Sequence, residues 1–206
     1  MIWFRRSVLA LVALLASVAA IEAALPKPQL APQAASLTGQ LLVATPEMGD
    51  PRFYRTVILI VRHNQTGALG ITLNRPMGER PLASLLEKLG EKDAIEGNVQ
   101  IFAGGPVQLD AGFVIHTADY KRPETIDIDG EVAVTASPDI LRDISRKAGP
   151  QKALVAFGYA GWGANQLETE LAHKAWFTIA ADLALIFDER RDRVWDEAMS
   201  RRPRDR

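Results

Sequence analysis

The chain has 206 residues, 48% of them hydrophobic and 24% charged, with a formal net charge of −1. This length favours one domain with extensions, and the composition excludes a disordered, collagen-like or low-complexity chain. The absence of cysteine excludes disulfides, thiolate metal sites, iron–sulfur clusters and a cysteine nucleophile.

The first twenty residues have the pattern of a secretory leader. Arg5 and Arg6 give a basic start, and an apolar run of about fourteen residues follows up to Ile21. Such a run matches a signal-peptide core and is shorter than the roughly twenty residues of a membrane span. Residues 1–20 are therefore predicted to be a signal peptide, cleaved after Ala20 for export to the periplasm, with Ile21-Glu22-Ala23 as a second choice of cleavage site. The alternatives are an uncleaved inner-membrane anchor and an unused upstream start codon.

Residues 21–37 are rich in proline and alanine and predict a linker. The folded domain is expected at 38–200, followed by a basic tail at 201–206. Without the leader and the tail the body of the chain is mildly acidic, so no nucleic-acid partner is expected from its charge. Contact with a membrane is expected only through an uncleaved leader.

The first half of the domain predicts strands, a loop and one helix. Residues 41–44 form a short strand, and the β-branched run 57–61 predicts a strand buried on both faces. Residues 63–67 are rich in turn formers and predict a loop, and the alternating segment 69–73 predicts a half-buried strand. Leucines at i, i+3, i+4 and i+7 predict an amphipathic helix that ends at Gly90; they are Leu82, Leu85, Leu86 and Leu89.

The second half alternates strands and helices. Strands are predicted at three apolar runs: 99–102, 113–116 and 153–157. Asp129-Gly130 predicts a hairpin with a two-residue turn, and Ser137-Pro138 starts a helix. Glu168 three residues after Asn165 predicts a capping box, and Val194 begins the apolar stripe of a last helix. Together these elements predict one α+β domain.

Motifs along the chain resemble the YqgE/AlgH family. In order they are LLVATP at 41–46, the Asp50, Pro51, Phe53, Arg55 and Val57 pattern, His63-Asn64, GALG at 67–70, NRP at 74–76, GGP at 104–106, Gly112-Phe113 with Ile115-His116, Gly158-Tyr159-Ala160 with Trp162, QLE at 166–168, Ala175-Trp176 and ADL at 181–183.

The resemblance covers roughly residues 37–199. It implies a compact α+β fold in which a forked mixed sheet closes into a pseudo-barrel with flanking helices. It implies no reaction, and the AlgH name carries a link to transcriptional regulation of alginate production. Family members usually start near the first strand without a leader, which implies a cytoplasmic location as the alternative to export.

Eight residues are candidates for ligand binding: His63, Asn64, Gly104, Gly105, His116, Tyr159, Gly161 and Trp162. His63 brings a group that titrates near neutral pH next to a polar loop residue. His116 at a strand end fits a hydrogen-bonded structural histidine or a general base. The pair at 104–105 either presents backbone N–H groups to an anion or allows a tight turn.

The glycine-rich run 158–163 precedes a predicted helix, as in phosphate sites at helix N-termini. Its spacing matches neither a P-loop nor a dinucleotide fingerprint. Tyr159 and Trp162 are interpreted either as a stacking platform for a flat ligand or as lids on a core. If Gly161 serves only the backbone, we expect it to have positive φ.

No catalytic residue, metal site or cofactor is predicted. The predicted function is a non-enzymatic binding or regulatory module that acts through a protein partner or a small ligand. The first alternative is a ligand-binding protein or enzyme that uses the glycine-rich loops with His63 or His116. Convergence of His63, Asn64 and loop 104–106 on one polar pocket would favour that alternative. The second is a transcriptional regulator, which rests on the family name alone.

Overall fold

The computed structural model describes residues 35–87 and 97–203. The predicted leader and nearly all of the predicted linker therefore lie outside the described residues, as do Leu89 and Gly90. The folded unit begins at Ser36. Among the described residues, no helix has the length and apolar character needed to cross a membrane.

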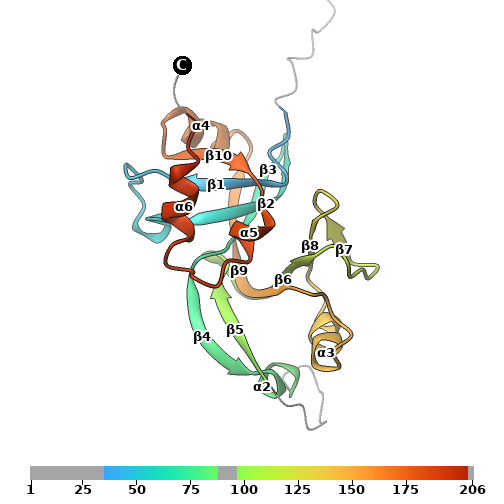
Figure 1. Cartoon of the computed structure of the whole chain (residues 1–206). Helices are drawn as coiled ribbons and strands as arrows, with labels where there is room; N and C mark the ends of the chain where they lie inside the picture. The colour runs from blue at the N-terminus through green and yellow to red at the C-terminus, as the bar shows by residue number, and fades with distance from the viewer. Residues whose placement is uncertain (1–34, 88–96, 204–206) are drawn as a thin grey trace, which may run out of the picture. The chain divides into compact units, whose positions relative to one another are not determined.

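The described residues form a ten-stranded forked sheet (Figure 1). In chain order the strands are β1 (Gln40–Ala44), β2 (Val57–Asn64), β3 (Gly67–Thr72), β4 (Pro76–Pro81), β5 (Asn98–Ala103), β6 (Val107–Thr117), β7 (Thr125–Asp127), β8 (Val132–Thr135), β9 (Ala153–Gly163) and β10 (Trp176–Ala180). The main path runs β10-β1-β2-β3-β9-β6-β8-β7, and the β4–β5 arm joins it at β9. Because β5 and β9 are parallel and the other pairs antiparallel, the sheet is mixed.

The predicted fold class is confirmed: this is an α+β fold in which the sheet curls strongly into a half-barrel. The flanking helices are short: η1 (Pro51–Phe53), α2 (Leu82–Glu87), α3 (Asp139–Ser145), α4 (Gln166–Ala172), α5 (Leu183–Ile186) and α6 (Val194–Ser200).

Strand β9 is the branch point of the fork. Its first half pairs with β5 and β6, and its second half pairs with β3. Gly158, with φ +74°, lies between the halves. Beside it, the N–H of Gly104 donates to the carbonyl of Phe157 (2.7 Å), and its own carbonyl accepts from the N–H of Thr72 (2.8 Å). Gly104 thus connects β9 to the end of β3.

The two chain segments cross here at backbone contact. A Cβ on Gly104 would overlap the carbonyl oxygen of Gly158, and a Cβ on Gly105 would overlap the carbonyl group of Tyr159. Only glycine allows backbones to approach this closely. The Gly pair therefore serves the crossing of two strands.

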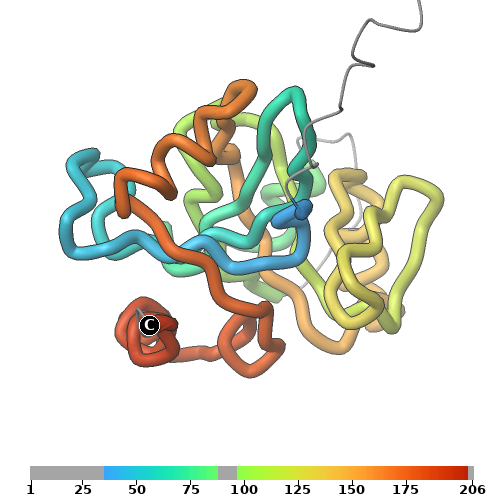
Figure 2. Tube along the Cα trace, turned by 90° about the horizontal axis from the view of Figure 1, so that it is seen from above, coloured from blue at the N-terminus to red at the C-terminus, as the bar shows by residue number. Residues whose placement is uncertain are grey.

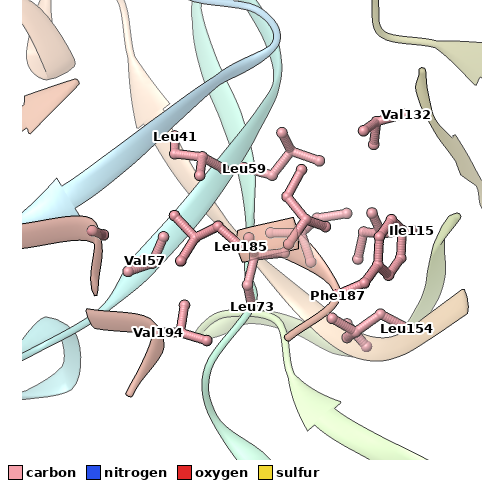
Figure 3. Close-up of a cluster of buried hydrophobic side chains, with 14 of the residues drawn as sticks. Leu41, Val57, Leu59, Leu73, Ile115, Val132, Leu154, Leu185, Phe187 and Val194 are labelled. Atoms are coloured by element: carbon pink, nitrogen blue, oxygen red, sulfur yellow. The ribbon is translucent and has the colours of Figure 1, made fainter. Parts of the chain in front are cut away.

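The β1–β2 pair is covered on both faces. On one face the curl encloses the main core, where Leu41 and Leu59 meet Leu185 of α5 and Val194 of α6 (Figure 3). On the other face α4 packs Leu167 against the same strands. Figure 2 shows α4 in orange and α5–α6 in red on opposite sides of β1. The prediction that 57–61 is buried on both faces is confirmed.

The other branch has a core of its own. Helices α2 and α3 place Leu82, Leu86 and Ile140 against Val114 of β6 and Val155 of β9. The predicted helix over the leucines at 82–86 is confirmed, with Leu86 fully buried. The sequence pattern did not predict strand β4. This strand forms the edge of the β4–β5 arm, and all six of its residues are exposed.

Three local predictions are wrong. His63 and Asn64 belong to β2, and the two-residue turn is Gln65-Thr66. The run 158–163 is the second half of β9 rather than a loop, and its positive φ falls on Gly158 instead of Gly161. The β7–β8 connection has three residues, because the N–H of Ile128 still donates to the carbonyl of Val132.

The predicted capping box is also absent. Asn165 has left-handed backbone angles (φ 60°), and its side chain makes no capping hydrogen bond. The backbone carbonyl oxygen of Asn165 instead accepts a hydrogen bond from the hydroxyl of Thr169 (2.8 Å). The side chain of Glu168 leaves the helix end and reaches His63 on β2.

We predict that Gly104→Ala lowers the free energy of unfolding by about 3 kcal/mol, the upper end of the usual range for overpacking, because its methyl group would overlap backbone atoms that cannot rotate away. Gly49→Ala is the matched control, since no atom lies within 4 Å of the Cβ position there. Urea unfolding of both variants measures the difference. Equal, small losses in the two variants would contradict the close crossing.

Candidate functional site

The eight candidate residues do not gather at one place in the fold. His63 and Asn64 are at the hairpin end of β2, where Asn64 pairs with Gly67 at the start of β3. Gly104 bonds to Thr72 at the opposite end of β3. His116 is on β6, Gly105 lies beside Tyr159 at the strand crossing, and Tyr159, Gly161 and Trp162 are on β9. His63, Asn64 and the 104–106 segment therefore do not converge on one polar pocket.

His63 holds the segment that enters the domain. Its Nδ1 accepts the backbone N–H of Leu37 (3.0 Å), and its Nε2 lies 2.7 Å from Oε1 of Glu168. Its carbonyl accepts from the hydroxyl of Ser36 (3.0 Å). Hydrogen bonds from its own backbone N–H and from His63 lower the pKa of Glu168. Both ring nitrogens are thus engaged in joining residues 36–37, β2 and α4.

Asn64 stabilises the adjacent turn. Its Oδ1 accepts from the backbone N–H of Thr66 (2.9 Å) and from the Thr66 hydroxyl (2.6 Å). This is an Asx turn, which leaves the oxygen of the amide occupied.

His116 is fully buried in a chain of neutral hydrogen bonds. Nδ1 lies 2.9 Å from the carbonyl of Thr117, which only accepts, so Nδ1 carries a proton. Nε2 then accepts from the hydroxyl of Thr135 (2.9 Å), which lies 2.7 Å from the hydroxyl of Thr125. Burial lowers the pKa of His116. This effect outweighs the hydrogen bond to the Thr117 carbonyl and the charge of Asp119, which both raise the pKa. The ring is therefore neutral in the folded protein at neutral pH.

Trp162 belongs to an indole cluster centred on a carboxylate. The Nε1–H groups of Trp162 and Trp176 both donate to Oε2 of Glu170, at 2.9 and 2.8 Å. Oε1 of Glu170 accepts from the side-chain amide of Gln166 (2.9 Å). The Trp162 and Trp176 rings meet edge to face at 6.1 Å, and Phe53 packs edge-on against Trp176 at 5.5 Å. One glutamate thus ties α4 to β9 and β10.

A pocket of about 330 Å³ opens beside this cluster. We call it the indole pocket, and the residues that matter for its chemistry are Asp50, Arg52, Phe53, Trp162, Glu170 and Trp176. Gly161 also lines it, so two of the eight candidates meet here. Tyr159 is not among the lining residues; its ring lies over Gly161 and packs edge-on against Phe113 at 6.1 Å.

The pocket has an excess of negative charge. Arg52 is paired with Asp50 (2.7 Å), and their hydrogen bond lowers the pKa of the Asp50 carboxyl. Glu170 remains as a carboxylate whose partners are neutral indole and amide groups. An anion would meet this charge and a cation would be attracted by it, so the surroundings of Trp162 run against the phosphate-site hypothesis. The N–H of Gly163, near the start of α4, is also occupied, by Oε1 of Gln166.

Sequence reasoning missed Phe53, Glu170 and Trp176. One signal was present for Glu170: it lies three residues after Leu167, on the helix face that is buried. A carboxylate on an apolar face requires polar partners, and a buried tryptophan N–H requires an acceptor. No spacing rule connects Glu170 and Trp176 with Phe53, because the three residues come from three separate elements.

Comparison with known proteins gives a consistent result. The family model described as AlgH-like matches residues 41–205. A UPF0301 protein of Rhodospirillum rubrum is 42% identical over 166 residues, which are 80% of this chain and 86% of that protein. The AlgH protein of Pseudomonas aeruginosa is 44% identical over 156 residues, which are 74% of this chain and 81% of that protein.

Two solved structures share the fold. The solution structure of AlgH from Pseudomonas aeruginosa matches with a TM-score of 0.70 at 40% identity, over 83% of this chain and 91% of that chain. The crystal structure of a protein from Corynebacterium diphtheriae matches with a TM-score of 0.65 at 20% identity, over 86% and 91% of the two chains. The second likeness concerns the fold alone.

We predict that burial of His116 makes stability depend on pH. Since its folded pKa is below the ordinary value of about 6.5, the folded protein binds fewer protons than the unfolded chain. The contribution of His116 to stability is complete at pH values above about 6.5, the ordinary pKa of histidine. It is lost as the pH falls from there through the lower pKa of the folded protein. Urea unfolding at pH 7.5 and 5.5 should show a smaller loss for His116→Gln than for wild type. His173→Gln, at an exposed position, is the control; if it changes the loss as much, His116 is not the source.

Proposed function

This chain belongs to the AlgH-like family, and on that premise we propose that its folded unit is a non-enzymatic binding module that holds a cationic group in the indole pocket. The names of its relatives state no ligand, substrate or reaction. The proposal therefore rests on the chemistry of the pocket itself.

The observation that carries the proposal is the Glu170 carboxylate between two indoles at the edge of a hollow. Tryptophan and phenylalanine rings attract cations through the negative face of the ring, by about 0.5–2 kcal/mol. A nearby carboxylate adds a charge-assisted hydrogen bond to an ammonium or guanidinium group. The pocket thus suits the basic group of a small amine or of a partner's side chain.

The geometry gives less support to an enzyme built on His63 or His116. His63 and Glu168 form a close histidine–carboxylate pair, but Nδ1 of the same ring holds the N–H of Leu37. His116 is enclosed, and both of its nitrogens bond within the protein. Proton transfer at either ring would require the loss of a hydrogen bond that holds the fold. Transcriptional regulation stays a prediction that rests on the family name.

Binding of N-acetyl-L-arginine amide, followed by calorimetry, tests the proposal. We expect binding to wild type, and at least about tenfold weaker binding to Glu170→Gln, which keeps the size of the side chain and an oxygen acceptor but removes its charge. Glu189→Gln changes an exposed glutamate outside the pocket and should bind as wild type does. Thermal unfolding of each variant reports whether the fold is retained.

Two results would contradict the proposal. One is preferential binding of inorganic phosphate or acetate over the arginine derivative. The other is equal affinity of wild type and a folded Glu170→Gln variant for the arginine derivative.

We further propose export, with residues 1–20 removed as a signal peptide. The AlgH-like match begins at residue 41, downstream of both the leader and the linker. Sequencing the amino terminus of the protein from its native organism should give Ile21 as the first residue. Recovery of Met1, or recovery of all the protein in the cytoplasmic fraction, would refute cleavage and export.

A further inference from the structure

A second pocket lies on the other branch of the sheet. It has a volume of about 270 Å³, and its chemistry is set by Leu85 of α2, Leu141 of α3, Val114 of β6, Phe157 of β9, Ser137 and Asp110. We call it the Phe157 pocket. It shares no lining residue with the indole pocket. Its size is near the lower end of the range for small-molecule sites.

The walls of the Phe157 pocket are apolar and aromatic. The Phe157 side chain is half-buried and lies on the same face of the sheet as Val114 and Val155, which belong to the packed core. Phe113 also lines the pocket, but its side chain packs against the main core on the opposite face. An apolar guest would remove the exposed surface of the Phe157 ring from water, which favours binding. A flat or branched hydrocarbon group fits this lining.

Gly112 keeps the hollow open. A Cβ at this position would lie 3.4 Å from Cε1 of Phe157, so a larger side chain would enter the space beside that ring. Its backbone angles are not of the left-handed kind. The backbone at Gly112 would therefore accept other residues, and the absence of a side chain there leaves space in the pocket.

Asp110 gives the pocket its charge. It is the charged residue in the lining, it is exposed, and it makes no ion pair or hydrogen bond within the part of the chain that the structure describes. Strand β6 leaves the β9 ladder between Val107 and Gly112, and Gln108 has φ 46° there. Such strain in a non-glycine residue persists where the surroundings enforce it, and it is concentrated at functional sites. The irregular segment brings an unpaired carboxylate to an apolar hollow.

From these observations we propose that the Phe157 pocket binds a small arylalkyl amine, with the ring against Phe157 and the ammonium group at Asp110. The carboxylate selects the positive charge, and the hollow selects the hydrocarbon part. This site is independent of the indole pocket, which recognises a cationic group without requiring an apolar body.

Titration of ¹⁵N- and methyl-labelled protein with 2-phenylethylamine, 2-phenylethanol and 3-phenylpropionate, followed by NMR, tests this assignment. We expect the amine to bind more tightly than the alcohol, and the carboxylate more weakly than either. The methyl signals that shift should be those of Leu85, Val114, Leu141 and Val155. Glu170→Gln should leave these shifts unchanged, which separates this site from the proposed function.

Two variants divide the roles of charge and space. Asp110→Asn should weaken binding of the amine about three- to fivefold, as expected for an exposed ion pair, and leave binding of the alcohol unchanged. Gly112→Leu should abolish binding of both ligands. Asp192→Asn, at an exposed position outside the pocket, is the charge control.

Three results would overturn the proposal: shifts confined to other residues, an amine affinity that Asp110→Asn leaves unchanged, or binding of 3-phenylpropionate as tight as that of the amine. If Gly112→Leu does not fold, the residues whose methyl signals shift and the amine affinity of the surface variant Asp110→Asn still test the proposal.

Discussion

The backbone crossing of residues 104–105 over Gly158 and Tyr159 is the constraint on which the rest of the structure depends. It brings three strands to one place, because Gly104 bonds to both β3 and β9 at the end of β5. A single strand, β9, can then belong to both branches of the fork. No side chain fits between the two segments, so glycine is required by contact distance as well as by φ.

Each branch covers its sheet with short helices, and this produces the two pockets. On the first branch, α4 buries two indoles whose N–H groups need an acceptor, and Glu170 supplies it. On the second, α2 and α3 pack over β6 and β9 but leave Phe157 half-exposed. Both hollows thus lie where helices only partly cover a strongly curled sheet.

The two buried histidines connect elements that lie far apart in the chain. His63 joins the entry segment to β2 and α4, and His116 joins β6 to β8 through hydroxyl groups. In both cases a neutral ring can act as donor at one nitrogen and acceptor at the other, which suits a buried position between two partners. Their place in the fold accounts for their hydrogen bonds without reference to a reaction.

The amino-acid sequence by itself determined the local elements and the family. The β-branched run 57–61, the leucine spacing at 82–86 and the apolar run 153–157 specified β2, α2 and the start of β9, because burial imposes an apolar pattern that can be read along the chain. Only the tertiary structure decided the partners. Glu168 looked like a cap for its own helix but bonds to His63, 105 residues away, and the run 158–163 looked like a loop but pairs with β3. Local patterns report which faces are buried, whereas the neighbours of a side chain depend on where strands cross. That crossing depends on glycines. Because glycine has no side chain, it adds nothing to the pattern of apolar and polar residues from which a crossing could be predicted.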